Sequence, residues 1–162
     1  MPDEVEEFLR RVAQMRAQAL ALRPSSVGLK PEAGPMWGFV MDVVTSNTDW
    51  YALVVLADGS TSLYTSSTFG IIGGGAHETV REAAALLWST AEGLVDVFEP
   101  SDDTTLPPAG STALRLLRFD GPRTLVGPDA ELGAGQHPAS PVCYAAHEVL
   151  GRLRLVTQSA HP

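Results

Sequence analysis

Two consecutive segments, residues 37–45 and 50–57, constrain the fold most, because each reads as a strand with two apolar faces. Both are rich in the β-branched and aromatic residues that strands favour, and a Ser-Asn-Thr-Asp turn joins them. Such strands lie in the middle of a sheet that is covered on both sides, by helices or by a second subunit. The faces of the first segment are predicted to be Trp37, Phe39, Met41 and Val43 against Val40, Asp42 and Val44.

The next segments extend this sheet. Asp58-Gly59 suits a tight turn into a third strand over residues 60–66, whose polar alternation is typical of a sheet edge. A second hairpin is expected from residues 111–119 and 123–127. Residues 128–137 read as a loop, with a short strand near Leu132 as an alternative. The sequence therefore predicts five or six strands in a mostly antiparallel sheet.

Two helices accompany this sheet. Residues 76–97 are amphipathic, with Gly93 as a weak point where the regular helix can end. Ser140-Pro141 is a good helix start, and Gly151 is a possible stop. Residues 153–157 can continue this last helix or form another strand.

A further helix is predicted at the N-terminus, over residues 3–22, with one apolar seam. This seam suits packing on the chain's own sheet or pairing with a second helix. The predicted organisation is an N-terminal helix (1–23), a Pro- and Gly-containing linker (24–35), one α+β domain (36–156) and a flexible tail (157–162). The seam residues that we predict as a dimer interface are Val5, Phe8, Val12, Met15 and Leu22.

This order of elements indicates an α+β fold with two to three helices. It resembles the profilin-like group, and within that group the roadblock-type proteins, which also have a leading helix. The likeness is one of element order, and the strand over residues 60–66 departs from the roadblock pattern. The resemblance implies a small dimeric scaffold or a GTPase-associated regulator.

Charge and composition limit the kinds of partner that this protein can bind. The net charge is −8, and between residues 32 and 114 Arg81 is the only cation among eleven carboxylates. We therefore expect no nucleic acid or membrane partner, and a basic partner would be attracted, although simple solubility also accounts for the charge. The single cysteine, the acidic N-terminus and the lack of a long apolar run predict a cytoplasmic protein. One lysine against ten arginines is typical of a GC-rich bacterial genome.

The glycine-rich segment before the helix at residue 76 is the first candidate site. Backbone N–H groups at a helix start attract anions, and glycines allow close approach of a ligand. No lysine follows, and the Rossmann glycine spacing is absent, so we predict neither a nucleotide-triphosphate loop nor a dinucleotide cofactor. A plain chain reversal explains the glycines equally well. The predicted ligand-binding residues are Gly73, Gly74, Gly75 and His77.

Two other polar groups stand out. Cys143 and His147 are four residues apart on a predicted helix, so they share a face and can make either an activated thiol or ordinary packing. No further ligands are evident, and we predict no metal site. Asp42 lies on an apolar strand face, and we expect it to form a structural ion pair with Arg115 or Arg118.

These observations favour a binding or scaffold domain over an enzyme, acting through contacts with itself as a homodimer or with another protein. One alternative is a small-ligand-binding protein or enzyme that uses residues 70–77. Another is an acidic immunity or inhibitor protein that masks a basic partner.

Overall fold

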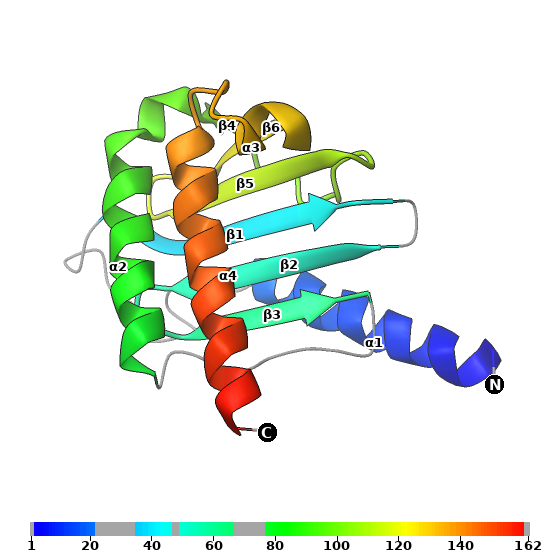
Figure 1. Ribbon diagram of the computed structural model, residues 1–162. Coiled ribbons are helices and arrows are strands. Elements are labelled where there is room, and N and C mark those ends of the chain that lie inside the picture. Colours follow the sequence, from blue (N-terminus) through cyan, green and yellow to red (C-terminus); the bar gives the residue numbers. More distant parts are fainter. Residues whose placement is uncertain (1, 22–34, 47–48, 67–76, 161–162) are drawn as a thin grey trace.

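The computed structural model describes residues 2–21, 35–46, 49–66 and 77–160 (Figure 1). Its elements lie in an order close to the predicted one. They are α1 (Pro2–Leu20), β1 (Met36–Val44), β2 (Trp50–Leu56), β3 (Thr61–Thr65), α2 (Glu78–Gly93), the 3-10 turn η4 (Val95–Val97), β4 (Glu99–Pro100), β5 (Ser111–Arg118), β6 (Arg123–Pro128), α3 (Asp129–Gly133) and α4 (Ser140–Ala160).

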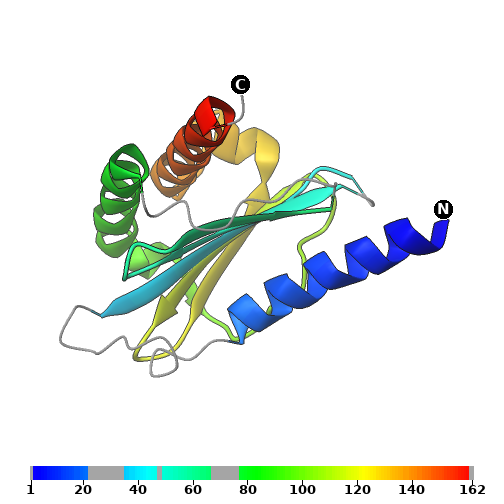
Figure 2. The ribbon, with the colours of Figure 1, turned by 90° about the horizontal axis from the view of Figure 1, so that it is seen from below.

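The strands form one antiparallel sheet of six strands in the order β3-β2-β1-β5-β6-β4, which confirms the α+β class. As predicted, β1 is central and β3 is an edge. Helices α2 and α4 lie side by side on one face, and α1 lies on the opposite face (Figures 1 and 2). No helix in the described part of the chain is long and apolar enough to cross a membrane.

The face beneath α2 and α4 holds the larger core. Phe39 and Met41 of β1 are fully buried there, and they belong to the same cluster as Leu87 of α2 and Leu153 of α4. Helix α2 ends at Gly93, where the sequence had its weak point. Helix α4 continues past Gly151 to Ala160, because Leu153 packs in the core and outweighs the roughly 1 kcal/mol cost of a helical glycine.

The predicted face of Trp37 is wrong. The pairing of β1 with β5 shifts register between Met36 and Gly38, which is the signature of a β-bulge. The extra residue turns Trp37 away from Phe39 and into the smaller cluster on the α1 side, with Val40. A one-residue shift of this kind reverses the facing of a side chain, and periodicity alone does not reveal it.

The loop predicted over residues 128–137 is also wrong in part, since it contains the short helix α3. Leu132 of α3 is buried, and this contact fixes the helix over the end of β6. The two-residue strand β4, which pairs with the start of β6, was likewise not expected. Both elements are too short for a sequence period to develop.

Helix α1 packs on its own sheet, but not through Met15. Arg16 is buried and Leu20 packs against the smaller cluster, whereas Met15 is 36% exposed. Leu22 and the side chains of Val5, Phe8 and Val12 lie outside the described part of the structure. The interface prediction therefore stays a prediction, with Met15 now placed on a side of α1 that leaves it accessible.

Arg16 reaches a carboxylate at the centre of the sheet. Asp42 is completely buried, and Arg16 donates from Nε to Oδ1 at 2.8 Å and from Nη2 to Oδ2 at 2.7 Å. Arg115 of β5 donates from Nε to Oδ2 at 3.0 Å. The predicted pair of Asp42 and Arg115 is thus confirmed, and Arg16 is a second partner that the sequence did not indicate. These three residues are called the Asp42 cluster below.

The same two guanidinium groups hold the loop that follows β4. Arg16 donates to the carbonyl oxygen of Thr104 at 2.8 Å, and Arg115 donates to the carbonyl oxygens of Asp103 and Thr105. Because these contacts join α1, β1, β5 and the loop, the chain covers the second face of its own sheet. All nine residues of β1 are buried without a second subunit.

Candidate functional site

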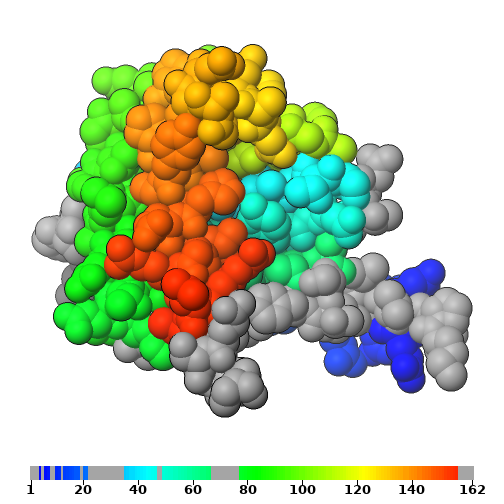
Figure 3. Space-filling view, viewed as in Figure 1, coloured from blue at the N-terminus to red at the C-terminus, as the bar shows by residue number. Residues whose placement is uncertain are grey.

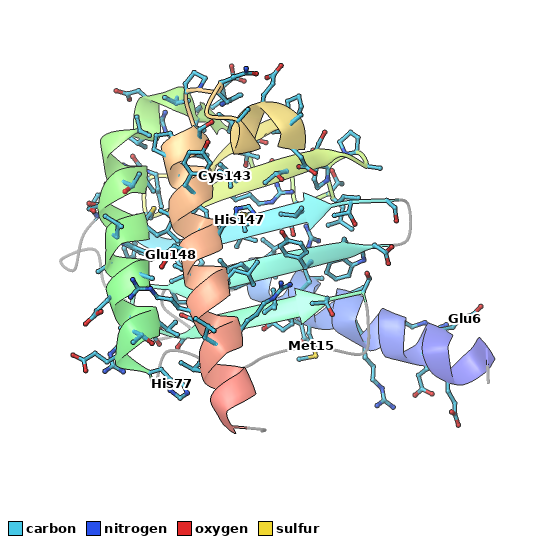
Figure 4. The ribbon with its side chains drawn as sticks, in the orientation of Figure 1. Glu6, Met15, His77, Cys143, His147 and Glu148 are labelled. Carbon is cyan, nitrogen blue, oxygen red and sulfur yellow. The ribbon has the colours of Figure 1, made fainter. Side chains whose placement is uncertain are left out.

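The first predicted site is only partly within the described structure. Gly73, Gly74 and Gly75 lie outside the described residues. His77 is exposed, adopts an extended conformation at the N-cap of α2 and makes no side-chain capping hydrogen bond. Figure 4 shows His77 far from Cys143 and His147, so His77 does not join that pair.

Cys143 and His147 do share a face of α4, as their spacing predicted. Cys143 Sγ lies 3.5 Å from His147 Nδ1, and the hydroxyl of Tyr51 lies 3.3 Å from His147 Nε2. Tyr51 comes from β2, so α4 and the sheet converge at the imidazole. The sequence did not connect Tyr51 to this pair, because the two segments are 96 residues apart.

The imidazole is not oriented to activate the thiol. His147 Nδ1 lies 2.9 Å from the carbonyl oxygen of Cys143, and a carbonyl only accepts, so Nδ1 carries the proton. A protonated Nδ1 cannot take the thiol proton. In the neutral ring, Nε2 then accepts from the Tyr51 hydroxyl, and the histidine is held by contacts on both nitrogens.

The electrostatics agree with this geometry. Burial, followed by the negative charge of Asp129, raises the pKa of the Cys143 thiol from 9.0 to about 11. Burial also raises the pKa of Tyr51, with Asp129 and Cys143 adding to the rise and Arg154 opposing it. Reactive cysteines have a lowered pKa, so Cys143 is a neutral thiol, and of the two predicted roles the packing role fits.

These side chains line a hollow of about 380 Å³, which we call the notch. It lies where α3 and α4 meet the ends of β1, β2 and β5, beside the part of the sheet that neither α2 nor α4 covers. Figure 3 shows cyan surface beside α4, in the region where β1 and β2 are joined. The residues that line the notch are Val43, Thr45, Tyr51, Thr112, Asp129, Leu132, Gly133, Cys143, Tyr144 and His147.

Two hydrogen bonds fix the polar rim of the notch. The hydroxyl of Thr112 donates to Asp129 Oδ1 at 2.6 Å, which orients the carboxylate. The hydroxyl of Tyr144 donates to the carbonyl oxygen of Gly133 at 3.0 Å, and the Tyr144 side chain remains about half exposed. Within the described part of the chain, Asp129 Oδ2 accepts no hydrogen bond.

Two other hollows are less suited to binding a ligand. One of about 290 Å³ lies between Leu20, Trp37 and the loop after β4, and its deepest polar group, Arg115, is already bonded to Asp42 and the loop. Another, of about 530 Å³, lies between the β2–β3 turn and α2 and is more open. Among the described residues there is no group of three or more His, Cys, Asp or Glu side chains that could hold a metal ion.

Comparison with known proteins gives no further guide to the site. No protein-family model matches the chain, and no curated protein matches it. Of the polar groups of the notch, sequence reasoning identified Cys143 and His147, and it treated Tyr51 as a core or interface anchor with an aromatic ligand pocket as the alternative. It missed Thr112, Asp129 and Tyr144, which meet the others only through the fold of the sheet.

Proposed function

We propose that this protein is a non-catalytic binding domain and that the notch is its recognition site. The observation that carries this proposal is the convergence of accessible polar side chains in a hollow of about 380 Å³ with apolar walls. This size falls within the range of ordinary ligand sites, and a few placed polar groups in apolar surroundings are typical of them.

Catalysis is disfavoured by the state of the same groups. A thiol whose pKa is about 11 is a poor nucleophile near neutral pH, and the imidazole proton is bonded to a carbonyl oxygen. Groups that are fixed in place but not activated suit recognition.

The low count of cysteine and the absence of a membrane-spanning helix among the described residues support a cytoplasmic location for the proposed domain.

A thermal-shift screen of small molecules and short peptides tests the proposal, because a ligand that binds the native state raises its melting temperature. Tyr144→Ala removes one wall of the notch, and Leu86→Ala removes a similarly exposed apolar side chain from α2 as a control. We expect compounds that stabilise the wild type and Leu86→Ala but not Tyr144→Ala. Equal stabilisation of both variants, or no stabilising compound at millimolar concentration, would contradict the proposal.

A second proposed role is homodimerisation through α1. The sheet does not require a partner subunit, but α1 projects beyond the strands toward its N-terminus (Figure 2), and apolar Met15 is 36% exposed on it. Light scattering on a size-exclusion column should give a dimer for the wild type and a monomer for Met15→Glu. Gln14→Glu, an equal change of charge at an exposed position turned about 100° from Met15 around α1, should remain dimeric. A monomeric wild type at micromolar concentration would rule this role out.

A further inference from the structure

We propose that the notch binds a positively charged nitrogen group, a primary ammonium or a guanidinium, with Asp129 as its counter-ion. This inference rests on the proposed function and adds the chemical class of the ligand. The hydrogen-bonding capacity, the aromatic walls and the charge of the notch all support it.

The hydrogen-bonding groups of the notch are mostly acceptors. Thr112 uses only Oδ1 of Asp129, and Oδ2 accepts nothing from the described residues. The Tyr51 hydroxyl uses its proton on His147 Nε2, so toward a ligand the Tyr51 oxygen can only accept. An ammonium or guanidinium group carries several donors and no acceptor, so it matches this set. An anionic ligand would find no lysine or arginine among the lining residues.

The aromatic walls favour the same class of ligand. Tyr51 and Tyr144 both line the notch, and the hydrogen bond from Tyr144 to Gly133 holds the second ring at the rim. A cation within about 6 Å of an aromatic ring is attracted by the ring's quadrupole, and this attraction grows when the cation leaves water. A carboxylate beside two tyrosine rings therefore provides both a charge partner and a surface for the alkyl stem.

Asp129 is the only Asp, Glu, Lys or Arg side chain among the residues that line the notch. Burial raises the pKa of both Tyr51 and Cys143, and the negative charge of Asp129 adds to the rise in each case. Arg154, an exposed residue farther along α4, acts in the opposite direction and lowers the pKa of Tyr51. The net charge of −8 adds a general attraction for cations.

A titration followed by NMR or calorimetry tests the inference with matched compounds. Nα-acetyl-lysine methylamide should bind at least tenfold more tightly than Nα-acetyl-norleucine methylamide, which has a similar stem without the charge. Asp129→Asn should remove this preference, and Arg154→Gln should strengthen binding of the lysine compound because a competing positive charge is lost. Putrescine, measured in parallel, distinguishes a free amine from an amino-acid side chain as the source of the cation.

The outcomes separate this inference from the proposed function. Norleucine binding equal to lysine binding, with both lost in Tyr144→Ala, would overturn the cation proposal and leave the notch as a binding site. An undiminished preference for lysine in Asp129→Asn would also overturn the cation proposal, because a group other than Asp129 would then bind the ammonium. The absence of binding by any compound at the notch would overturn both. Circular dichroism of each variant shows that it is folded.

Discussion

The Asp42 cluster and the notch lie on opposite faces of the same sheet. Two neighbouring residues of β1 belong to them: Asp42 is at the centre of the cluster, and Val43 lines the notch. In the cluster, Asp42 accepts three N–H groups from two arginines, and both arginines also bond to loop carbonyls. In the notch, Asp129 accepts one described side-chain bond and remains accessible. Polar groups that are satisfied within the chain hold it together, whereas groups with spare capacity beside an open hollow are available to a ligand.

The largest effect is expected from Asp42→Asn. Removing the buried charge leaves two guanidinium groups without their counter-ion, and breaking a buried pair in this way costs about 3–5 kcal/mol of stability. Urea denaturation measures the loss. Asp102→Asn makes the same chemical change at an exposed position, where we expect less than about 0.5 kcal/mol. A loss below about 1 kcal/mol in Asp42→Asn would contradict the structural role of the cluster.

The next largest effect concerns Cys143. A pKa raised from 9.0 to about 11 leaves about 100-fold less thiolate at pH 8, so iodoacetamide should label the folded protein about 100-fold more slowly than the urea-unfolded chain. The labelling rate should keep rising as the pH increases toward 11. Free glutathione in the same reaction serves as the reference. Fast labelling with a midpoint near pH 7 would mean an activated thiol and would contradict the packing role of Cys143.

A smaller loss is expected from Arg16→Met, which leaves Asp42 paired with Arg115. No charge is stranded, so the cost should be about 2 kcal/mol, as for lost hydrogen bonds to a charged group. The hydrogen exchange of α1 should rise more than that of β1. Arg11→Met, at an exposed pair with Glu7, should cost less than about 0.5 kcal/mol. If Arg16→Met costs as much as Asp42→Asn, the two arginines are not sharing one counter-ion as we describe.

The smallest stability effect is expected from Asp129→Asn. The amide oxygen can still accept the hydroxyl hydrogen of Thr112, and the position is only partly buried, so the loss should stay below about 1 kcal/mol. Comparing the stability losses of Asp129→Asn and Asp42→Asn in the same urea series gives the sharpest contrast between the notch and the Asp42 cluster. A loss above about 2 kcal/mol would mean that Asp129 is a structural residue like Asp42.

Much of the fold could be predicted from sequence, because its long elements carry clear periods. The doubly apolar strands predicted a central position for β1, and the polar alternation of residues 60–66 predicted an edge strand. The facing of Trp37 could not be predicted, since a bulge leaves no mark in the hydrophobic pattern. Helix α3 was missed because five residues do not establish a period.

The sites were predictable only where their residues are local. Cys143 and His147 are one helical turn apart, so their contact followed from spacing. The pairing of Asp42 with Arg115 followed from the need of a buried carboxylate for a partner, but Arg16 comes from a helix 26 residues away. Tyr51 and Asp129 meet α4 only through strand pairing and the placement of α3, which no short motif encodes.

The central claim is that this protein binds its ligand at the notch, whereas the buried groups around Asp42 only stabilise the fold. Chemical-shift mapping of the labelled protein with a panel of amines, acids and neutral amides tests it most directly. We predict that the perturbed residues gather at the notch, around Thr45, Tyr51, Asp129 and His147, and that the amines give the largest shifts. Perturbations centred on the hollow beside Trp37, or none at millimolar concentration, would contradict the account.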